Sequence, residues 1–145
     1  MTAHTNPNPS TFTYVHRVCY SDTDAAGFVY HGRYLEIFER SRAEWLAQKN
    51  LSPSKLISDY KILMPVRELQ MEFHKPGRLD DILYIDQIIK YRSRAQVTIK
   101  QTAKRNGSKS PEGMELIVSA SINIVCLDVD TLKPKAWPDW LFPAE

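Results

Sequence analysis

The chain has 145 residues, of which 43% are hydrophobic and 25% charged, a composition typical of one globular domain with an apolar core. Its formal net charge of +2 is too small to indicate nucleic acid as the main partner, although a local basic cluster could still bind a small phosphate-bearing ligand. No apolar run reaches the ~18 residues of a membrane span, and the N-terminus lacks the basic and apolar regions of a signal peptide, so we expect a cytoplasmic protein without a membrane span.

Residues 1–10 are polar and contain prolines, which predicts a flexible tail before a single domain at 11–145. The stretch Thr11 to Tyr20, TFTYVHRVCY, is rich in aromatic and β-branched residues and predicts a strand. A turn region follows, in which Gly27 and Gly32 are the typical turn residues.

A helix is predicted from Arg33 to about Asn50, because its apolar residues recur at helical spacing on one broad face. Neither proline nor glycine interrupts it, and the sequence Asn50-LSPS marks its end. This is the one long helix that the pattern indicates. The apolar positions are Tyr34, Leu35, Ile37, Phe38, Trp45 and Leu46.

The remaining chain reads as strands with alternating apolar and polar residues. In the first, Leu69, Met71 and Phe73 are predicted to share one face. A proline-rich, irregular C-terminal segment follows the last strand. The predicted strands are 67–75, 81–91, 94–104 and 115–127. The inward faces predicted for the last two are Ala95, Val97, Ile99, Gln101 and Ala103, and Leu116, Val118, Ala120, Ile122, Ile124 and Cys126.

The order strand, helix, four strands predicts an α+β fold in which an antiparallel sheet of about five strands covers one long central helix. A curved sheet wrapped around a single helix is the hot-dog arrangement. The pattern alone does not separate it from a ferredoxin-like fold, although a single helix instead of two weighs against the latter.

The segment between the first strand and the helix carries the candidate chemistry. At the helix start, the backbone N–H groups of His31 and Gly32 could polarise a carbonyl oxygen, an effect worth ~3 kcal/mol in a transition state. Asp24 could activate water or attack that carbonyl, and the His31 side chain could orient the reacting groups. The segment offers no serine or cysteine nucleophile, so the acyl group has to be reactive, as a thioester is.

The apolar residues around Asp24 are predicted to keep water away from its carboxylate; they are Ala25, Ala26, Phe28 and Val29. For Asp22 a turn or cap role is favoured. Two carboxylates without a further acidic partner make a poor metal site, so no metal is predicted. Cys19 and Cys126 lack zinc-ligand spacing and are predicted to be reduced, partly buried thiols.

The stretch Asp22 to Leu46, DTDAAGFVYHGRYLEIFERSRAEWL, resembles the signature of the 4-hydroxybenzoyl-CoA thioesterase family of hot-dog proteins, and within it the bacterial Tol-Pal-associated acyl-CoA thioesterases. The resemblance implies hydrolysis of acyl-CoA without metal or cofactor, with Asp24 and His31 as the catalytic residues and the helix start at His31 and Gly32 as the carbonyl-polarising donor. It also implies homotetramers built as dimers of dimers, with active sites at subunit interfaces. One departure is Ala26-Gly27, where this branch often carries two glycines.

The basic cluster Lys90, Arg92 and Arg94 corresponds to a position where the family carries basic residues for the nucleotide end of CoA. The alternative is a solvated hairpin tip.

The sequence therefore predicts an acyl-CoA thioesterase acting on a small aliphatic or aromatic acyl group. One alternative is a thioesterase for acyl groups on acyl carrier protein. The other is an oligomer without catalytic activity that binds acyl ligands or serves as a scaffold.

Overall fold

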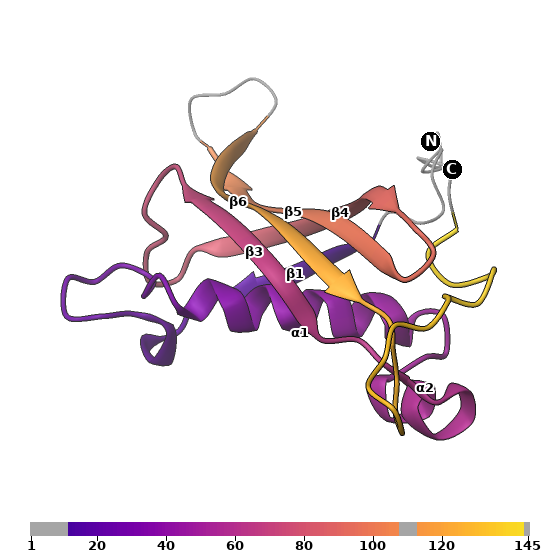
Figure 1. Ribbon diagram of the computed structural model, residues 1–145. Coiled ribbons are helices and arrows are strands. Elements are labelled where there is room, and N and C mark those ends of the chain that lie inside the picture. The colour runs from indigo at the N-terminus through magenta and orange to yellow at the C-terminus, as the bar shows by residue number, and fades with distance from the viewer. Residues whose placement is uncertain (1–11, 108–112, 144–145) are drawn as a thin grey trace.

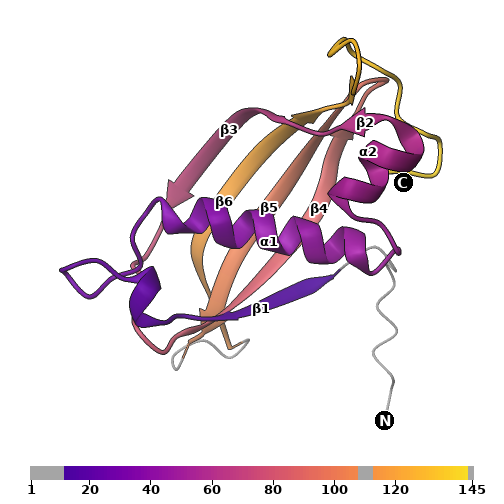
Figure 2. The same cartoon turned by 90° about the horizontal axis from the view of Figure 1, so that it is seen from below.

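The computed structural model describes residues 12–107 and 113–143, so the predicted N-terminal tail lies outside the described residues. A five-stranded antiparallel sheet in the order β1-β4-β5-β6-β3 curves around α1, as Figures 1 and 2 show from two directions. This confirms the predicted α+β hot-dog arrangement. The sheet strands are β1 (Thr13–Arg17), β3 (Val66–Phe73), β4 (Ile82–Arg92), β5 (Gln96–Asn106) and β6 (Met114–Val125), and a short 3-10 helix, η1 (Tyr20–Asp22), follows β1.

The predicted long helix is α1 (Arg33–Ala47), which lies across the concave face of the sheet (Figure 2). It ends three residues before the predicted stop, because Asn50 adopts a left-handed conformation with φ 58° and the backbone turns there. The helix buries one face against the sheet, and the apolar cluster between them forms the core. Its buried residues are Tyr34, Ile37, Phe38, Ser41, Trp45 and Leu46.

A second helix, α2 (Pro53–Tyr60), was not predicted. Ser52 caps it by accepting a hydrogen bond from the Lys55 N–H at 3.1 Å, and Pro53 occupies its first turn. Ser-Pro is a typical helix start, but the sequence analysis used it only as the end of α1. A two-stranded pair, β2 (Ile62–Leu63) and β7 (Leu127–Asp128), lies beside this helix. Within the described ranges, no helix is long and apolar enough to cross a membrane.

The inward faces of β5 and β6 are confirmed with one exception. The side chains of Val97, Ile99, Gln101 and Ala103 are buried, as are those of β6 from Val118 to Ile124 at alternate positions. Leu116 was predicted to face inward, but it is 37% exposed. The pairing register shifts between Ala103 and Lys104, so that Ile117 and Val118 both enter the core and the alternation reverses beyond them.

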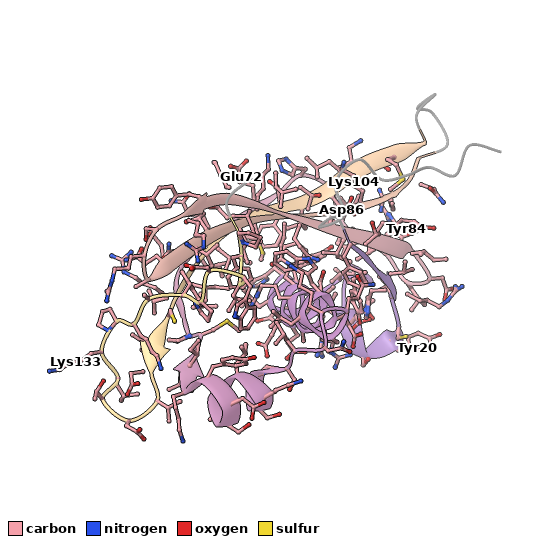
Figure 3. All side chains as sticks on the ribbon, turned by 90° about the vertical axis from the view of Figure 1, so that its right-hand side faces the viewer. Tyr20, Glu72, Tyr84, Asp86, Lys104 and Lys133 are labelled. Carbon is pink, nitrogen blue, oxygen red and sulfur yellow. The ribbon has the colours of Figure 1, made fainter. Side chains whose placement is uncertain are left out.

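The two faces of the sheet carry different kinds of side chain. Figure 3 shows the labelled Glu72, Asp86 and Lys104 on the convex side, away from α1. On the concave side β3 presents Leu69, Met71 and Phe73, which pair with the inward residues of β6 and so confirm the predicted alternation. Because β3 is an edge strand with a neighbour on one side only, Leu69 stays 36% and Phe73 51% exposed.

A chain of polar side chains crosses the core between α1 and the centre of the sheet. Ser41 donates to the Gln87 Oε1 atom at 2.7 Å, and the Gln101 Nε2 atom donates to the same oxygen at 3.1 Å. Gln101 also donates to the Phe38 carbonyl at 3.1 Å and accepts from Arg42 at 2.9 Å. Both glutamines are fully buried, so these bonds provide the partners that buried amides require.

The C-terminal segment is irregular, as predicted, yet it belongs to the core. Trp137, Leu141 and Phe142 are buried, and Phe142 contacts Trp45 with ring centroids 5.7 Å apart. Arg92 fixes the segment by donating to the carbonyls of Pro138 and Leu141.

Both cysteines are free, as predicted. Cys126 is buried, and this burial raises the pKa of its thiol to about 11. Cys19 is exposed instead of partly buried, because it lies where the chain leaves β1 for η1.

Candidate active site

The predicted site residues Asp24, His31 and Gly32 all lie in the segment that joins β1 to α1, which projects beyond one end of the helix (Figure 2). Residues 23–29 form a tight hairpin within it. The Asp24 N–H donates to the Phe28 carbonyl at 2.9 Å, and the Gly27 N–H donates to the Asp24 carbonyl at 3.0 Å. Gly27 adopts φ +82°, a conformation that costs a side-chain-bearing residue about 1 kcal/mol.

The Asp24 carboxylate holds this hairpin with one oxygen only. Its Oδ1 atom accepts from the Ala26 N–H at 2.9 Å and from the Phe28 N–H at 3.4 Å. Among the described residues, no group bonds to its Oδ2 atom. Asp24 is exposed, so the second oxygen is available to a water molecule or a substrate.

The predicted apolar lining does not close around Asp24 within one chain. Ala25 and Ala26 are exposed, Phe28 is half-buried beneath the Arg78 guanidinium at 5.0 Å, and only Val29 is buried. The hairpin projects from the fold, and none of the described residues forms a second layer over it (Figure 1). Exclusion of water from this carboxylate would therefore need a group from outside the chain.

The start of α1 carries the predicted free donors. Gly32 is the residue before the helix, the Arg33 N–H donates to the Tyr30 carbonyl at 2.8 Å, and the Leu35 N–H donates to the Gly32 carbonyl at 3.3 Å. In the part of the chain that the structure describes, the N–H groups of His31 and Gly32 meet no acceptor. They lie at the positive end of the helix dipole, where an oxyanion is stabilised.

The His31 side chain is exposed and belongs to an aromatic group at the end of β3. Its ring lies 4.5 Å from that of Tyr30 and 6.3 Å from that of Phe73, between centroids, and Phe73 in turn lies 5.9 Å from Tyr34. No described residue bonds to either imidazole nitrogen. The ring is thus positioned by aromatic contacts and keeps both nitrogens available.

Asp22 has the structural role that the sequence favoured. Its carboxylate is 6% exposed and accepts from the Cys19 N–H at 2.9 Å and from the His16 ring at 2.8 Å, with Arg33 3.6 Å away. Burial by itself would raise the pKa of Asp22, but the Cys19 N–H, the His16 ring and the Arg33 charge outweigh it and lower that pKa. Asp22 therefore joins β1, η1 and the start of α1 and is unavailable for chemistry.

The loop from Lys75 to Asp81 packs against the hairpin of residues 23–29. Arg105 fixes this loop by donating to the Pro76 carbonyl and to the Asp81 carboxylate, both at 2.8 Å. The Gly77 carbonyl accepts from the Val29 N–H at 2.8 Å. The Tyr34 hydroxyl is buried against Gly77, and burial raises the pKa of Tyr34 to about 12.

Gly77→Ala is expected to lower the free energy of unfolding by about 2 kcal/mol, because the new methyl group overpacks this contact. A Cβ atom at Gly77 would lie 2.6 Å from the Tyr34 hydroxyl and 2.9 Å from a Val29 methyl carbon. Urea unfolding measures the change. Gly107→Ala is the matched control, since its Cβ would come no nearer than 3.3 Å to another atom. Equal stability of the two variants would contradict the close packing at Gly77.

The predicted coenzyme cluster lies elsewhere in the chain. Lys90 and Arg92 are at the end of β4 and Arg94 follows in the β4–β5 turn, whereas the opposite end of β4 meets the segment that carries Asp24. An 11-residue strand spans about 36 Å. Lys90 and Arg94 are exposed, and Arg92 binds the C-terminal carbonyls. One chain therefore does not bring this cluster to Asp24.

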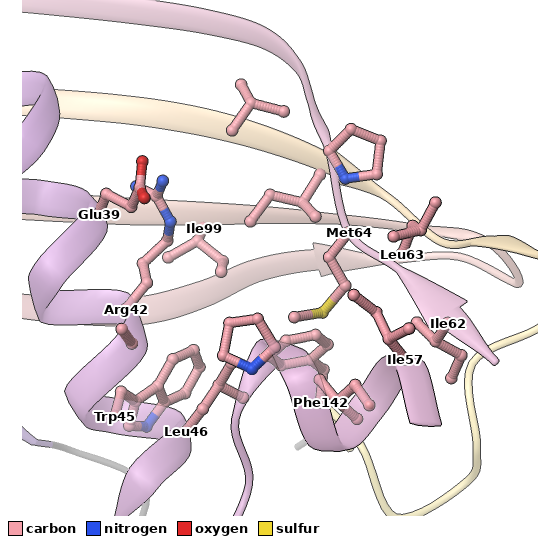
Figure 4. Close-up of a pocket in the computed structure, with 16 residues that line it drawn as sticks. Glu39, Arg42, Trp45, Leu46, Ile57, Ile62, Leu63, Met64, Ile99 and Phe142 are labelled. Atoms are coloured by element: carbon pink, nitrogen blue, oxygen red, sulfur yellow. The ribbon is translucent and has the colours of Figure 1, made fainter. Parts of the chain in front are cut away.

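An apolar cavity of about 380 Å³, which was not predicted from the sequence, lies between the C-terminal half of α1, α2 and the start of β3 (Figure 4). It could have been found only by recognising α2, whose residues line it. Representative lining residues are Trp45, Leu46, Leu56, Ile57, Met64 and Phe142. Within residues 12–107 and 113–143, no group of three or more potential metal ligands occurs.

Three comparisons relate the chain to known proteins. A sequence profile of the thioesterase superfamily matches residues 26–112. The acyl-CoA thioesterase YbgC of Haemophilus influenzae is 32% identical over 127 residues, which cover 88% of each chain. The acyl-CoA thioester hydrolase YbgC of Escherichia coli is 33% identical over 132 residues, covering 90% of this chain and 92% of the relative. The crystal structure of Slr0204, a 1,4-dihydroxy-2-naphthoyl-CoA thioesterase from Synechocystis, superposes with a TM-score of 0.78 at 26% identity over 89% of this chain and 90% of that one.

Proposed function

Because the chain belongs to the thioesterase superfamily, it is a thioester hydrolase, and we propose that it hydrolyses acyl-CoA to a free acid and CoA, with Asp24 as general base or nucleophile. One observation carries the assignment of roles. A carboxylate with an unbonded oxygen and two backbone N–H groups without acceptors lie in the same short segment at the start of α1. These are a base and an oxyanion site, the two elements that acyl transfer to water requires.

In the proposed reaction the thioester carbonyl oxygen accepts hydrogen bonds from the N–H groups of His31 and Gly32. Asp24 either takes a proton from water as that water attacks the carbonyl carbon, or attacks the carbon itself to form an anhydride that water then opens. In either route the C–S bond breaks when the tetrahedral adduct collapses, before water opens any anhydride, and the departing CoA thiolate takes a proton from Asp24 or from water. The His31 ring, placed beside the helix start by Tyr30, orients the reacting groups.

The open surroundings of Asp24 support the further proposal that the working enzyme is a homo-oligomer, a tetramer built as a dimer of dimers. Ala25 and Ala26 are exposed, and the apolar residues Leu69 and Phe73 on the edge strand β3 are partly uncovered. A second copy over this region would shield the carboxylate from bulk water. It could also supply Lys90 and Arg94 to the coenzyme phosphates, which one chain cannot do. Independence of metal is part of the proposal on the strength of the family resemblance, and the cytoplasmic location stays a prediction from the sequence.

The test is release of free CoA thiol from a panel of aliphatic and aromatic acyl-CoAs, with and without EDTA. We expect turnover that EDTA leaves unchanged. The exposed Cys19 thiol reacts with the reagents that detect free thiols, so the assay needs an enzyme-only blank. The buried Cys126 thiol does not react with them in the folded protein. Loss of turnover with EDTA would contradict the metal-free mechanism. If no acyl-CoA is hydrolysed but acyl groups on acyl carrier protein are, the proposed substrate is wrong and the carrier-bound acyl group is the substrate.

A further inference from the structure

We infer that the acyl group lies in a channel along the contact between α1 and β3, and that the preferred substrates carry long, unbranched aliphatic chains. This inference rests on the proposed function, because the channel is useful only if the thioester carbonyl binds at the start of α1. It extends that proposal beyond the small acyl groups that the sequence indicated. The proposed channel runs from His31 through a small hollow and into a larger cavity that reaches Phe142.

The first stretch begins at the proposed oxyanion site. The His31 ring contacts the edge of Phe73, and one turn further along α1 the Tyr34 ring contacts Phe73 as well. The next inward residues are Leu35 on α1 and Met71 on β3, and both line a hollow of about 120 Å³. The rings of His31, Tyr34 and Phe73 thus lie between the start of α1 and the end of β3, and we place the entrance of the channel beside them, next to the hollow.

The second stretch joins this hollow to the larger cavity. Glu39, Arg42 and Val66 line both spaces, so the two are adjacent and share walls. The larger cavity, of about 380 Å³, continues along α1 as far as Trp45 and Phe142, as Figure 4 shows. Apart from Glu39 and Arg42, its lining residues are apolar, which is the surface that an alkyl chain prefers.

The length of this channel sets the chain that fits. Gly32 and Trp45 are thirteen helical positions apart, or about 20 Å at ~1.5 Å per residue. An extended chain of single bonds advances about 1.2 Å per bond, as the polypeptide backbone does. A chain of roughly 16 bonds would therefore reach from the helix start to the end of the cavity. We place the end of the channel at Phe142, which lines the larger cavity and whose segment Arg92 holds.

The two charged residues at the junction do not contradict an aliphatic occupant. The Arg42 guanidinium donates to the buried Gln101 at 2.9 Å, and its alkyl stem can form part of the wall. Burial lowers the pKa of Arg42, and the charge of Glu39 opposes that shift. Glu39 lies three residues before Arg42 on α1 and its charge acts on this guanidinium, so the cation already has a counter-charge nearby and needs none from the acyl group.

The experiment compares kcat/KM for butyryl-, decanoyl- and palmitoyl-CoA in the wild type and in Ala43→Trp. Ala43 lines the larger cavity, and an indole there would fill the space beyond the hollow. In the wild type we expect kcat/KM to be at least about 100-fold higher for palmitoyl-CoA than for butyryl-CoA, because the added methylenes are buried. In Ala43→Trp, palmitoyl-CoA turnover should fall at least about 10-fold while butyryl-CoA turnover stays within about twofold. Glu44→Trp is the matched control, because Glu44 is exposed on the neighbouring position of α1 and does not line the cavity.

The possible results separate the channel from the reaction. Turnover of butyryl-CoA without any preference for longer chains, or an equal effect of Ala43→Trp on all esters, would overturn the channel and leave the thioesterase intact. Faster hydrolysis of sebacoyl-CoA than of decanoyl-CoA would also overturn it, since Arg42 would then bind a terminal carboxylate. Absence of turnover on every ester would remove both proposals. Phe142→Ala, if folded, should raise the ratio of stearoyl- to palmitoyl-CoA turnover; an unchanged ratio would contradict its place at the closed end.

Discussion

Asp24→Asn is expected to lower kcat for acyl-CoA hydrolysis by about 10³-fold, because an amide can neither accept a proton from water nor attack the thioester. The substitution preserves the local structure. The amide oxygen replaces Oδ1 and still accepts from the N–H groups of Ala26 and Phe28, so the hairpin remains closed. A loss of turnover can then be assigned to the missing carboxylate and not to a rearranged loop. Single-turnover assays with the preferred ester measure the effect on the chemical step.

Two controls make this result interpretable. Asp59→Asn removes one carboxylate from the exposed surface of α2 and should leave kcat unchanged. Circular dichroism and sedimentation should show the same fold and oligomer for Asp24→Asn as for the wild type. Turnover of Asp24→Asn within about tenfold of the wild type would exclude Asp24 as base or nucleophile.

Asp22→Ala is expected to lower the free energy of unfolding by about 3 kcal/mol, the largest effect on stability that we predict. The substitution leaves the Cys19 N–H and the partly buried His16 ring without their acceptor and removes the counter-charge of Arg33. Urea unfolding at neutral pH measures the loss, with Asp59→Ala as the exposed control. A difference below about 1 kcal/mol would show that the Asp22 contacts do not hold β1 to the helix start.

The same carboxylate predicts a pH dependence. The pKa of Asp22 is lowered in the folded protein relative to an ordinary aspartate, at about 3.9. Its contribution is therefore fully present above about pH 4 and is lost as the pH falls through the lower, folded-state pKa. The stability difference between the wild type and Asp22→Ala should be constant from neutral pH to about pH 5 and should shrink below pH 4. A constant difference down to pH 2 would contradict this role.

Much of the fold could be predicted because its elements carry unambiguous patterns. The fifteen residues of α1 keep a helical spacing of apolar residues, and β5 alternates strictly from Val97 to Ala103. These two elements, with four further strands, specify an antiparallel sheet over one helix. The site residues could be proposed for a similar reason. Asp24 and His31 lie within eight residues of each other and next to a helix start, so their proximity follows from the chain itself.

Other features depend on contacts that the sequence does not display. The bulge that exposes Leu116 arises from the pairing of β5 with β6, which single-strand alternation cannot reveal. The helix α2 has a recognisable cap at Ser52, but its eight residues are too few for a clear period. The exposure of Ala25 and Ala26 also could not be predicted, because apolar character does not indicate whether a second layer lies above a turn.

The hydrogen bonds of Ser41, Gln87 and Gln101 have a consequence for how the enzyme could change over time. An apolar helix face alone tolerates rotation and sliding over a sheet, since one aliphatic contact replaces another at little cost. Three buried hydrogen bonds do not tolerate such a movement, because any shift of α1 by a single residue would leave amide groups unsatisfied in the core. The start of α1 is thus held at a fixed height relative to the sheet. The residues along the apolar channel could then be exchanged freely, so that new acyl specificities could be acquired without moving the oxyanion donors from their place.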